Sequence, residues 1–545
     1  MEDSAEKIEF SVQRKILFWL GSSWRKKIFP KSINNAIWKR INDLSSYEEH
    51  ARQITSHTYS FDQNINVPED YQIHMNGLWL VELFPSSYSE DLFNQLDESG
   101  WDGVHAYAMN DDLNSEKARE ARAKKNIRWW RLGQDVDKKC RGLIPDSVSL
   151  DLPCEFEYVE YKAIQIGSSL TAVSAFFSPA EEYVSKLNTE WHANHEPILL
   201  KTHGKRPQAL GRHFSDIYAT QLARYEIYES ARKWMSKRCG GFFSKNGLNI
   251  PAADLLLFEG IDPVTEPMSR RCWDADRALG LDGIFHWKST EMSNLAIVPY
   301  DEHHSDYDFI GIVGETKKAV EPIAEHLEMY GNDEGHAISY HYADHVQDIL
   351  LQICIQNYIN AMLEKYAKRR DEAYKEYKKH RSKKAEELRF EMLSDSLDIK
   401  EAALDASLLW EPVWRKWDGL EDLKMVPSPR CQSDDSLSSR TIDLIEEFKV
   451  ESSRNFELLL KRDSAYRDIL ATASSIGADN ANARLSRIAI IVAFISLIVA
   501  IMTLCSPLIH FQETPTTLER ATEDSSVQTE TVDNYIEKSE RNPSV

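Results

Sequence analysis

Side chains that could bind a metal ion are concentrated in one part of the chain. Eleven of the 17 histidines lie between residues 192 and 345. His341 and His345 are four residues apart, so a helix would present both rings on one face, with Asp348 one turn further on. Two imidazoles and a carboxylate form a workable ligand set for a divalent cation. Such a cation could activate a water molecule, which makes a metal-dependent hydrolase one hypothesis for the chain.

A second group of candidate ligands is His303 and His304, which lie within the acidic segment DEHHSDYD. That segment is equally typical of a solvated turn, and the chain has no H-E-x-x-H pattern, the more specific sign of a catalytic zinc site. A structural or surface role is the interpretation that we favour for these side chains. The metal hypothesis, with a divalent cation as cofactor, has five ligands: His341, His345, Asp348, His303 and His304.

Other catalytic patterns fit poorly. Residues 311–317 (GIVGETK) follow a strand-like run but lack the G-x-x-x-x-G-K-[ST] spacing of a phosphate-binding loop. The chain has no G-x-S-x-G elbow, and Cys239 is expected to be a buried or incidental thiol. Trp129 and Trp130, which two arginines flank, could form a stacking surface, although core packing is the simpler expectation. No catalytic residue is therefore assigned, and the sequence leans away from an enzyme.

Composition narrows the class of protein. The chain has 545 residues and a formal net charge of −22, which argues against a dedicated nucleic-acid-binding protein because phosphate neutralisation needs a cationic surface. Apolar residues make up 42% of the chain, enough for a sizeable core. The seven cysteines include no C-x-x-C pair, so neither a disulfide framework nor a thiolate zinc site is expected.

Short strand-like runs and helices alternate irregularly over residues 61–345, which predicts a mixed α/β (α+β) body. Two β-rich runs, 156–166 and 169–177, are separated by Gly167-Ser168 and predict a hairpin. Ser178 and Pro179 are a plausible start for a helix that reaches residue 192. A further helix is expected over 214–237, ending near two glycines.

Two long helices are expected after the body. Residues 346–409 contain neither Gly nor Pro, and an apolar seam with spacings of four, three and four residues runs from Ile355 to Tyr366. We expect a stalk helix over 346–417, with a break near Ser394, then a linker over 418–438. A second stalk helix is expected over 439–487 and would run antiparallel to the first. A coiled-coil seam of this kind favours a homo-oligomer.

The strongest signal in the chain is the apolar segment 488–511, which is long enough to cross a bilayer. Arg484 and Arg487 precede it and a polar, mostly acidic tail over 512–545 follows. The positive-inside rule then places the N-terminal part in the cytoplasm and the tail, which we expect to be disordered, on the opposite side. Residues 1–60 are basic and aromatic, and we expect them to be helical and to pack on the body.

The order of parts resembles the CorA-type magnesium transporters, which combine an α/β body, long stalk helices and a C-terminal membrane segment. The similarity covers 346–511 and includes the entry of NANARLSR (480–487) into the apolar helix. The sequence departs from the family by having one membrane helix instead of two and by lacking the Gly-Met-Asn loop between them. Its nearest counterpart, Tyr330-Gly331-Asn332, lies far upstream of the membrane segment, so no pore residue is carried over.

The leading hypothesis is a single-pass membrane protein whose cytoplasmic body acts in sensing or scaffolding and which self-associates through the stalk and membrane helix. Its expected partners are the lipid bilayer and further copies of itself, without nucleic acid. The identity of any small-molecule ligand stays open. The alternatives are a divalent-cation transport protein of the CorA type and a membrane-tethered metal-dependent hydrolase.

Overall fold

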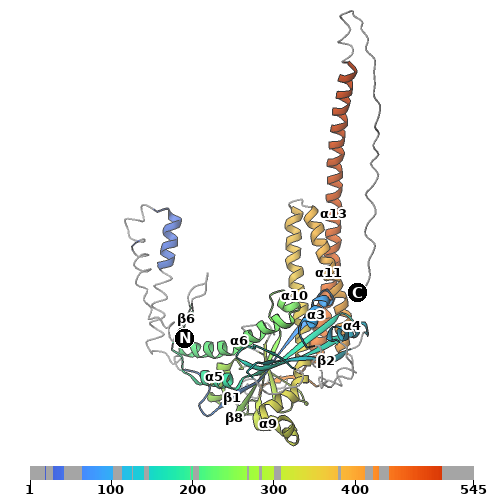
Figure 1. Ribbon diagram of the computed structural model, residues 1–545. Helices are drawn as coiled ribbons and strands as arrows, with labels where there is room; N and C mark the ends of the chain where they lie inside the picture. Colours follow the sequence, from blue (N-terminus) through green and yellow to red (C-terminus); the bar gives the residue numbers. More distant parts are fainter. Residues whose placement is uncertain are drawn as a thin grey trace, which may run out of the picture. The chain divides into compact units, whose positions relative to one another are not determined.

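The computed structural model describes residues 19, 29–41, 64–101, 113–124, 127–139, 147–196, 198–200, 208–266, 269–281, 285–299, 309–378, 382–410, 422–428 and 441–505. The chain forms two compact units, Met1–Ser474 and Ser475–Val545 (Figure 1). We call the first unit the body. Histidines 303 and 304, the linker 418–421 and 429–438, the tail 512–545 and most of residues 1–60 lie outside the described residues. Residues 31–41 are helical, as expected for part of the N-terminal segment.

A mixed sheet of 11 strands forms the centre of the body, in the order β13-β12-β9-β10-β11-β8-β1-β5-β4-β2-β3 (Figure 1). Neighbouring strands are antiparallel except for the pairs β8–β11 and β2–β3, which are parallel. The mixed α/β class is therefore confirmed. The strands are β1 (Gln72–Phe84), β2 (Arg128–Asp137), β3 (Ser147–Leu150), β4 (Phe156–Ile166), β5 (Leu170–Pro179), β8 (Ala252–Glu259), β9 (Phe285–Lys288), β10 (Leu295–Pro299), β11 (Phe309–Glu315), β12 (Lys424–Pro427) and β13 (Ile442–Asp443).

Several helices pack on this sheet, and a separate two-stranded sheet pairs β6 (Ile198–Leu200) with β7 (Gln208–Leu210). Helix α10 packs on β1 and β8, and helix α6 packs on β1 and β5. The helices are α3 (Ser89–Glu98), α4 (Asn114–Lys124), α5 (Glu181–His192), α6 (Arg212–Cys239), α7 (Phe242–Lys245), α8 (Arg270–Leu279), α9 (Thr316–Val320), α10 (Glu334–Lys378), α11 (Ser382–Ala406) and α13 (Leu444–Cys505), with 3-10 turns η2 (Ser86–Tyr88), η4 (Glu321–Tyr330) and η5 (Ser407–Trp410).

The predicted hairpin is confirmed as β4 and β5, which pair antiparallel from Ile166–Leu170 outwards. Gly167 lies in the turn with a φ of 58°, a conformation that suits glycine. The helix after it is also confirmed, but its predicted start is wrong. Ser178 and Pro179 are still in β5, and Ala180 is the N-cap of α5, without a side-chain hydrogen bond. Strand pairing with β4 continues up to Pro179 and displaces the local capping pattern.

The long helix expected over 346–417 is instead two helices. Helices α10 and α11 run antiparallel: Lys365 pairs with Asp395 (3.0 Å), and Arg369, one turn later on α10, also lies near Glu391, one turn earlier on α11 (3.8 Å). The expected break near Ser394 is wrong, because α11 is continuous there. The reason is that Asp395 forms ion pairs with Lys365 and Arg369 of α10, so its polar side chain contacts a neighbouring helix and α11 is not interrupted.

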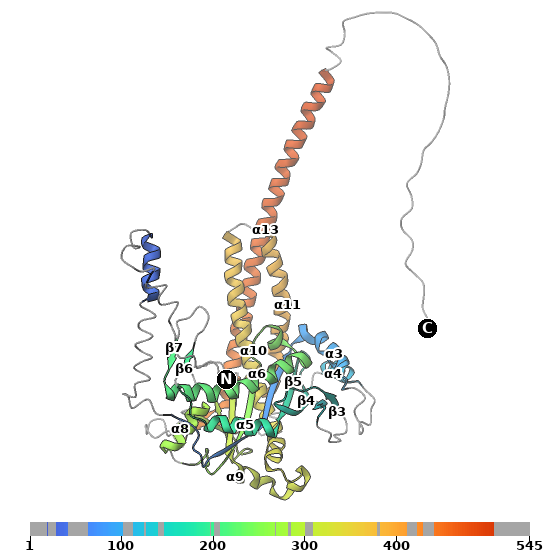
Figure 2. The same cartoon turned by 60° about the vertical axis from the view of Figure 1, so that its left-hand side comes forward.

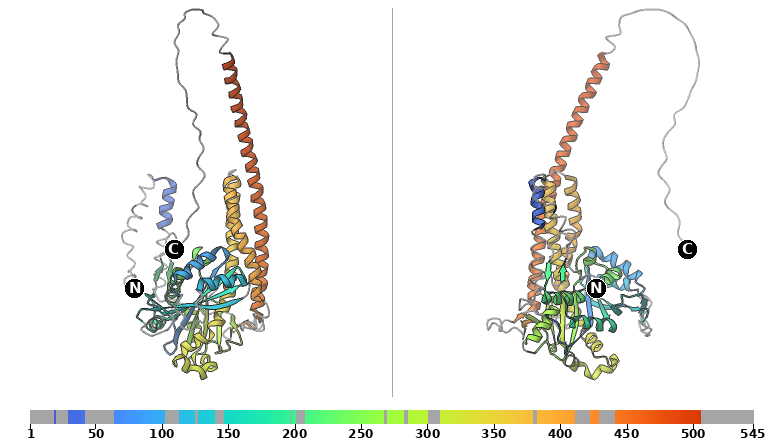
Figure 3. Two further views of the ribbon diagram at one scale, coloured as in Figure 1. Left: turned by 45° about the vertical axis from the view of Figure 1, so that its right-hand side comes forward. Right: turned by 90° about the vertical axis from the view of Figure 1, so that its left-hand side faces the viewer.

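Helix α13 begins beside α10 and runs parallel to it, so the antiparallel course expected of the segments 346–417 and 439–487 does not hold for α10, the first part of 346–417. Gln356 of α10 accepts a hydrogen bond from Ser452 (2.7 Å), and Tyr366, ten residues later, donates to Asp463 (2.8 Å). Residue numbers increase together along both helices. Because α11 reverses the chain between them, the third helix returns in the direction of the first. Figures 2 and 3 show α10, α11 and the first part of α13 side by side.

The hairpin turn is tied to α11 by the buried carboxylate of Asp405, which predicts a strong effect of its removal. It accepts hydrogen bonds from the Ser168 amide (2.8 Å) and from the amide and hydroxyl of Ser169 (2.6 Å each). We expect Asp405→Ala to lower the free energy of unfolding by about 2–4 kcal/mol, because three donors lose their acceptor. Urea unfolding of the body measures this. Glu401→Ala, on the exposed side of α11, is the control and should change stability by less than about 0.5 kcal/mol.

Candidate membrane anchor and buried polar network

The predicted metal ligands on the described part of the chain lie along the first half of α10. His341 is exposed and His345 is half-buried, with its Nε2 4.0 Å from Oε2 of Glu291. Burial, followed by the nearby ring of His345, lowers the pKa of His341. No three His, Cys, Asp or Glu side chains among the described residues are placed to hold a metal ion. His303 and His304 lie outside those residues, so the metal site stays a prediction.

The sequence predicted burial for two side chains, and the structure confirms it for Cys239 but not for Trp129. Cys239 is fully buried, as expected, and burial followed by the nearby Glu82 raises the pKa of its thiol. Trp129 is 58% exposed, so core packing is the wrong expectation for it. It lies near the start of β2, where the strand is still exposed, and Lys162 Nζ lies 4.1 Å from its ring centroid. Lys162 also pairs with Asp344 of α10 at 2.6 Å.

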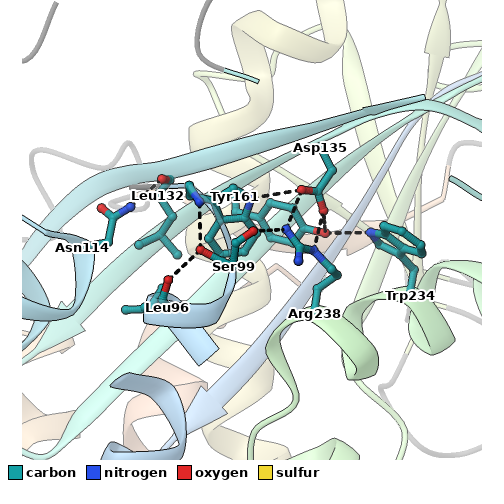
Figure 4. A network of polar contacts seen from close by, with 9 residues as sticks. Leu96, Ser99, Asn114, Leu132, Asp135, Tyr161, Trp234 and Arg238 are labelled. Carbon is teal, nitrogen blue, oxygen red and sulfur yellow. Dashed lines mark hydrogen bonds and ion pairs between the residues drawn. The ribbon is translucent and has the colours of Figure 1, made fainter. Parts of the chain in front are cut away.

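A polar network within the body is centred on Asp135, a fully buried residue of β2 (Figure 4). Its carboxylate accepts two hydrogen bonds from Arg238 at the end of α6, each 2.8 Å long. Tyr161 of β4 donates to it at 3.1 Å, and the indole of Trp101 donates at 3.0 Å. The Tyr161 hydroxyl in turn accepts from Trp234 of α6 at 2.9 Å. The network joins two strands and a helix through one carboxylate.

The electrostatics of this network favour a structural role. Desolvation alone would lower the pKa of Arg238, but the hydrogen bonds and charge of Asp135 outweigh it and raise the pKa of the guanidinium. The guanidinium also donates to the carbonyl of Ser99 at 2.9 Å and lies 5.0 Å from the ring of Trp101. Both carboxylate oxygens of Asp135 are occupied and out of contact with water. A base or nucleophile would need a free, reachable atom, which Asp135 lacks.

A second buried carboxylate, Glu82 of β1, organises the start of α7. It accepts hydrogen bonds from the amides of Phe243 (2.8 Å) and Ser244 (3.0 Å) and from the Ser244 hydroxyl (2.5 Å). Burial raises the pKa of Glu82, although these hydrogen bonds act in the opposite direction. Neither Glu82 nor Asp135 was predicted from the sequence. For Glu82 the available signal was an acidic residue in an otherwise apolar run, since such a residue must find a partner on another element. Strand β2 carries two arginines, a glutamine and a second aspartate, so Asp135 does not stand out in it.

Among the described residues of the second unit, one helix is long and apolar enough to cross a membrane. It spans Asn482–Thr503, 22 residues with a mean hydropathy of 2.6, and none of it is buried. This agrees with the predicted segment as far as residue 505, where the described residues end. Ser496 and Thr503 donate hydrogen bonds to the carbonyls of Val492 (2.8 Å) and Val499 (2.9 Å) of the same helix. Both polar side chains are therefore satisfied without water, as a bilayer requires.

No protein-family model matches the chain, and no curated protein matches it.

Substitution of Asp135 tests the structural role of the network. We expect Asp135→Asn to lower the free energy of unfolding by about 3–5 kcal/mol, because it leaves Arg238 as a largely buried cation without a counter-charge. Chemical denaturation measures the change. Asp151→Asn is the matched control, since Asp151 is exposed and pairs with Lys138 at 2.8 Å. It should cost less than about 1 kcal/mol. Equal effects of the two substitutions would contradict the role assigned to Asp135.

The lowered pKa of His341 predicts a pH dependence. In the pH range just below the usual histidine pKa of about 6.5, the unfolded chain binds the proton more readily than the folded chain. Stability contributed by this residue is therefore lost as the pH falls through that value. We expect His341→Gln to lose less stability than the wild type between pH 7.5 and 5.5 in urea unfolding. Tyr340→Phe, which removes no imidazole, should follow the wild type.

Proposed function

We propose that this protein is a single-pass membrane protein whose cytoplasmic body serves as a sensing or scaffolding module. The observation that carries the proposal is the Asn482–Thr503 helix, which has the length and hydropathy of a membrane span and is not buried in the chain. A core helix of a soluble protein would be mostly buried. Insertion of this helix into a bilayer would remove its apolar surface from water.

The orientation is part of the proposal. Arg484 and Arg487 lie at the N-terminal end of the span, and the residues after it, 512–545, are mostly polar and acidic. By the positive-inside rule, the body lies on the cytoplasmic side and the tail on the opposite side. Protease treatment of sealed vesicles tests this, because only the exposed side is digested. Digestion of the tail in vesicles with the cytoplasmic face outwards would contradict the assignment.

Scaffolding is favoured over catalysis by the state of the polar groups in the body. The buried carboxylates Glu82, Asp135 and Asp405 each accept several internal hydrogen bonds, and none is placed to act on a substrate. We propose self-association through the stalk formed by α10, α11 and the start of α13, and through the membrane helix. Small residues allow close approach of membrane helices, and they recur in the span at Ala489, Ala493, Ser496 and Ala500.

A second candidate is divalent-cation transport of the CorA type. The observation that favours it is the continuity of α13, which is helical from Leu444 through the apolar span. Magnesium flux into proteoliposomes that contain the full chain tests it. Flux at the level of empty liposomes would exclude this candidate and leave the scaffold proposal unaffected.

Charged substitutions within the span test the anchor. We expect the double variant Ile495→Lys, Ile498→Lys to move the protein from the membrane to the soluble fraction, since each lysine costs about 2.5–3.5 kcal/mol at the centre of a membrane helix. Ile469→Lys, on the same helix but in the body and 60% exposed, is the matched control and should leave the protein in the membrane. Membrane fractionation with carbonate washing measures both. Retention of the double variant in the membrane would contradict the proposal.

A further inference from the structure

The segment in which α10 ends and α11 begins concentrates positive charge that the proposed function does not use. Residues 365–384 contain ten Lys or Arg and three Asp or Glu, which gives a charge of +7. Because the whole chain carries −22, the remaining residues carry −29. This short segment is therefore opposite in charge to the rest of the chain.

Part of this charge is matched inside the body. Lys365 and Arg369 form ion pairs with Asp395 of α11, with N–O distances of 3.0 and 2.6 Å. We call the lysines further along the basic tip: Lys375 and Lys378 at the end of α10, and Lys383 and Lys384 in the first turn of α11. Lys375 is exposed, so its ammonium group is available to an external partner.

The basic tip lies at the end of the body from which the chain continues to the membrane span. Helices α10 and α13 run parallel, and Tyr366 of α10 donates a hydrogen bond to Asp463 of α13 (Figure 2). Two parallel helices advance together, so Lys375 lies near the level of Thr472, two residues before the body ends at Ser474. The first turn of α11 lies at the same end, because α11 runs antiparallel to α10.

This end of the body is connected to the span by a short stretch of chain. Residues 475–481 are helical, and the span begins at Asn482. Seven helical residues rise about 10 Å. The attraction between charges extends over a Debye length of about 8 Å at physiological salt, and the flexible lysine side chain adds to this reach. With the span inserted, lipid headgroups are therefore within the range of the basic tip.

We propose that the basic tip binds anionic lipid headgroups of the leaflet at which the span begins. The inference rests on the proposed membrane anchor and its orientation, which place the tip at the cytoplasmic leaflet, where anionic lipids attract lysines close to the surface. Tyr374, one residue before Lys375, is 66% exposed, and tyrosine is enriched at the interface between membrane and water. Two kinds of side chain that this interface favours are thus adjacent in α10.

A lipid surface fits the charge distribution better than a nucleic acid does. A nucleic acid in solution would be repelled by the acidic remainder of the chain and could diffuse away. The anchor keeps the bilayer at a high local concentration, so four lysines can bind it although the net charge of the chain is unfavourable. Repulsion between the same leaflet and the acidic remainder confines the contact to the basic tip.

Hydrogen–deuterium exchange of the full chain in lipid nanodiscs tests the contact. One set of discs contains phosphatidylcholine alone, and the other contains about 30% phosphatidylserine to supply anionic headgroups. We expect the amides of residues 371–378 and 382–387 to exchange about ten-fold more slowly in the anionic discs, since binding of the tip opposes the opening of these helix ends. Sodium chloride at about 0.5 M, which shortens the Debye length to about 4 Å, should abolish the difference.

Charge-neutral variants assign the effect to the basic tip. The combined variant Lys375→Gln, Lys378→Gln, Lys383→Gln, Lys384→Gln keeps a high helix propensity and should exchange at the same rate in both kinds of disc. The matched control removes the same charge from four exposed lysines elsewhere on the body and should keep the ten-fold difference: Lys124→Gln, Lys138→Gln, Lys139→Gln, Lys186→Gln. Unchanged exchange of strand β1 shows that each variant is folded.

The outcomes separate this inference from the proposed function. A wild-type chain that enters both kinds of disc and exchanges equally in them would overturn the inference and leave the anchor intact. A chain that enters neither would overturn the anchor, and the inference with it. Loss of the difference in the control variant as well would overturn the assignment to the basic tip. Protection of the tip by a short single-stranded RNA in phosphatidylcholine discs, without protection by phosphatidylserine, would overturn the lipid assignment in favour of nucleic acid.

Discussion

The body depends on one constraint: carboxylates placed inside an apolar sheet and helix core must find donors on other elements. A buried ionised group without partners is costly, so each such residue fixes the position of a distant segment. Arg224 and Asp254 are the clearest pair, with two contacts of 2.5 and 2.6 Å between α6 and β8 and almost no exposure. Asp135 joins β2 to β4 and α6, and Asp405 joins the β4–β5 turn to α11. These hydrogen bonds determine how distant elements are aligned with one another, and they also stabilise the fold.

The same rule operates where the three long helices meet. Asp463 of α13 is buried and accepts from Tyr366 of α10, from Ser396 of α11 and from Arg467 of its own helix. One carboxylate thereby joins three helices at a single level, and the contact of Ser452 with Gln356 further down the pair shows that α10 and α13 run parallel. Helix α11 therefore buries polar side chains such as Asp395 on its inner face, while its outer face exposes apolar side chains such as Phe390.

The candidate membrane span, Asn482–Thr503, satisfies its polar side chains in a different way. In the body, polar side chains are satisfied by residues far away in sequence, whereas in the span Ser496 and Thr503 are satisfied by carbonyls four residues earlier. A helix in a bilayer has no other local source of hydrogen bonds. The span can therefore be recognised from a short window of sequence, while the networks of the body cannot.

The amino-acid sequence alone predicts the features that depend on neighbouring residues: the apolar helix and the β4–β5 hairpin. Their signals are runs and periods within about 20 residues. Only the tertiary structure decided the features that depend on distant partners, including the network of Asp135, the parallel course of α10 and α13, and the exposure of Trp129. Asp135 and Arg238 are 103 residues apart. A single sequence carries no mark that pairs two such residues, because their attraction acts only after the fold has brought them together.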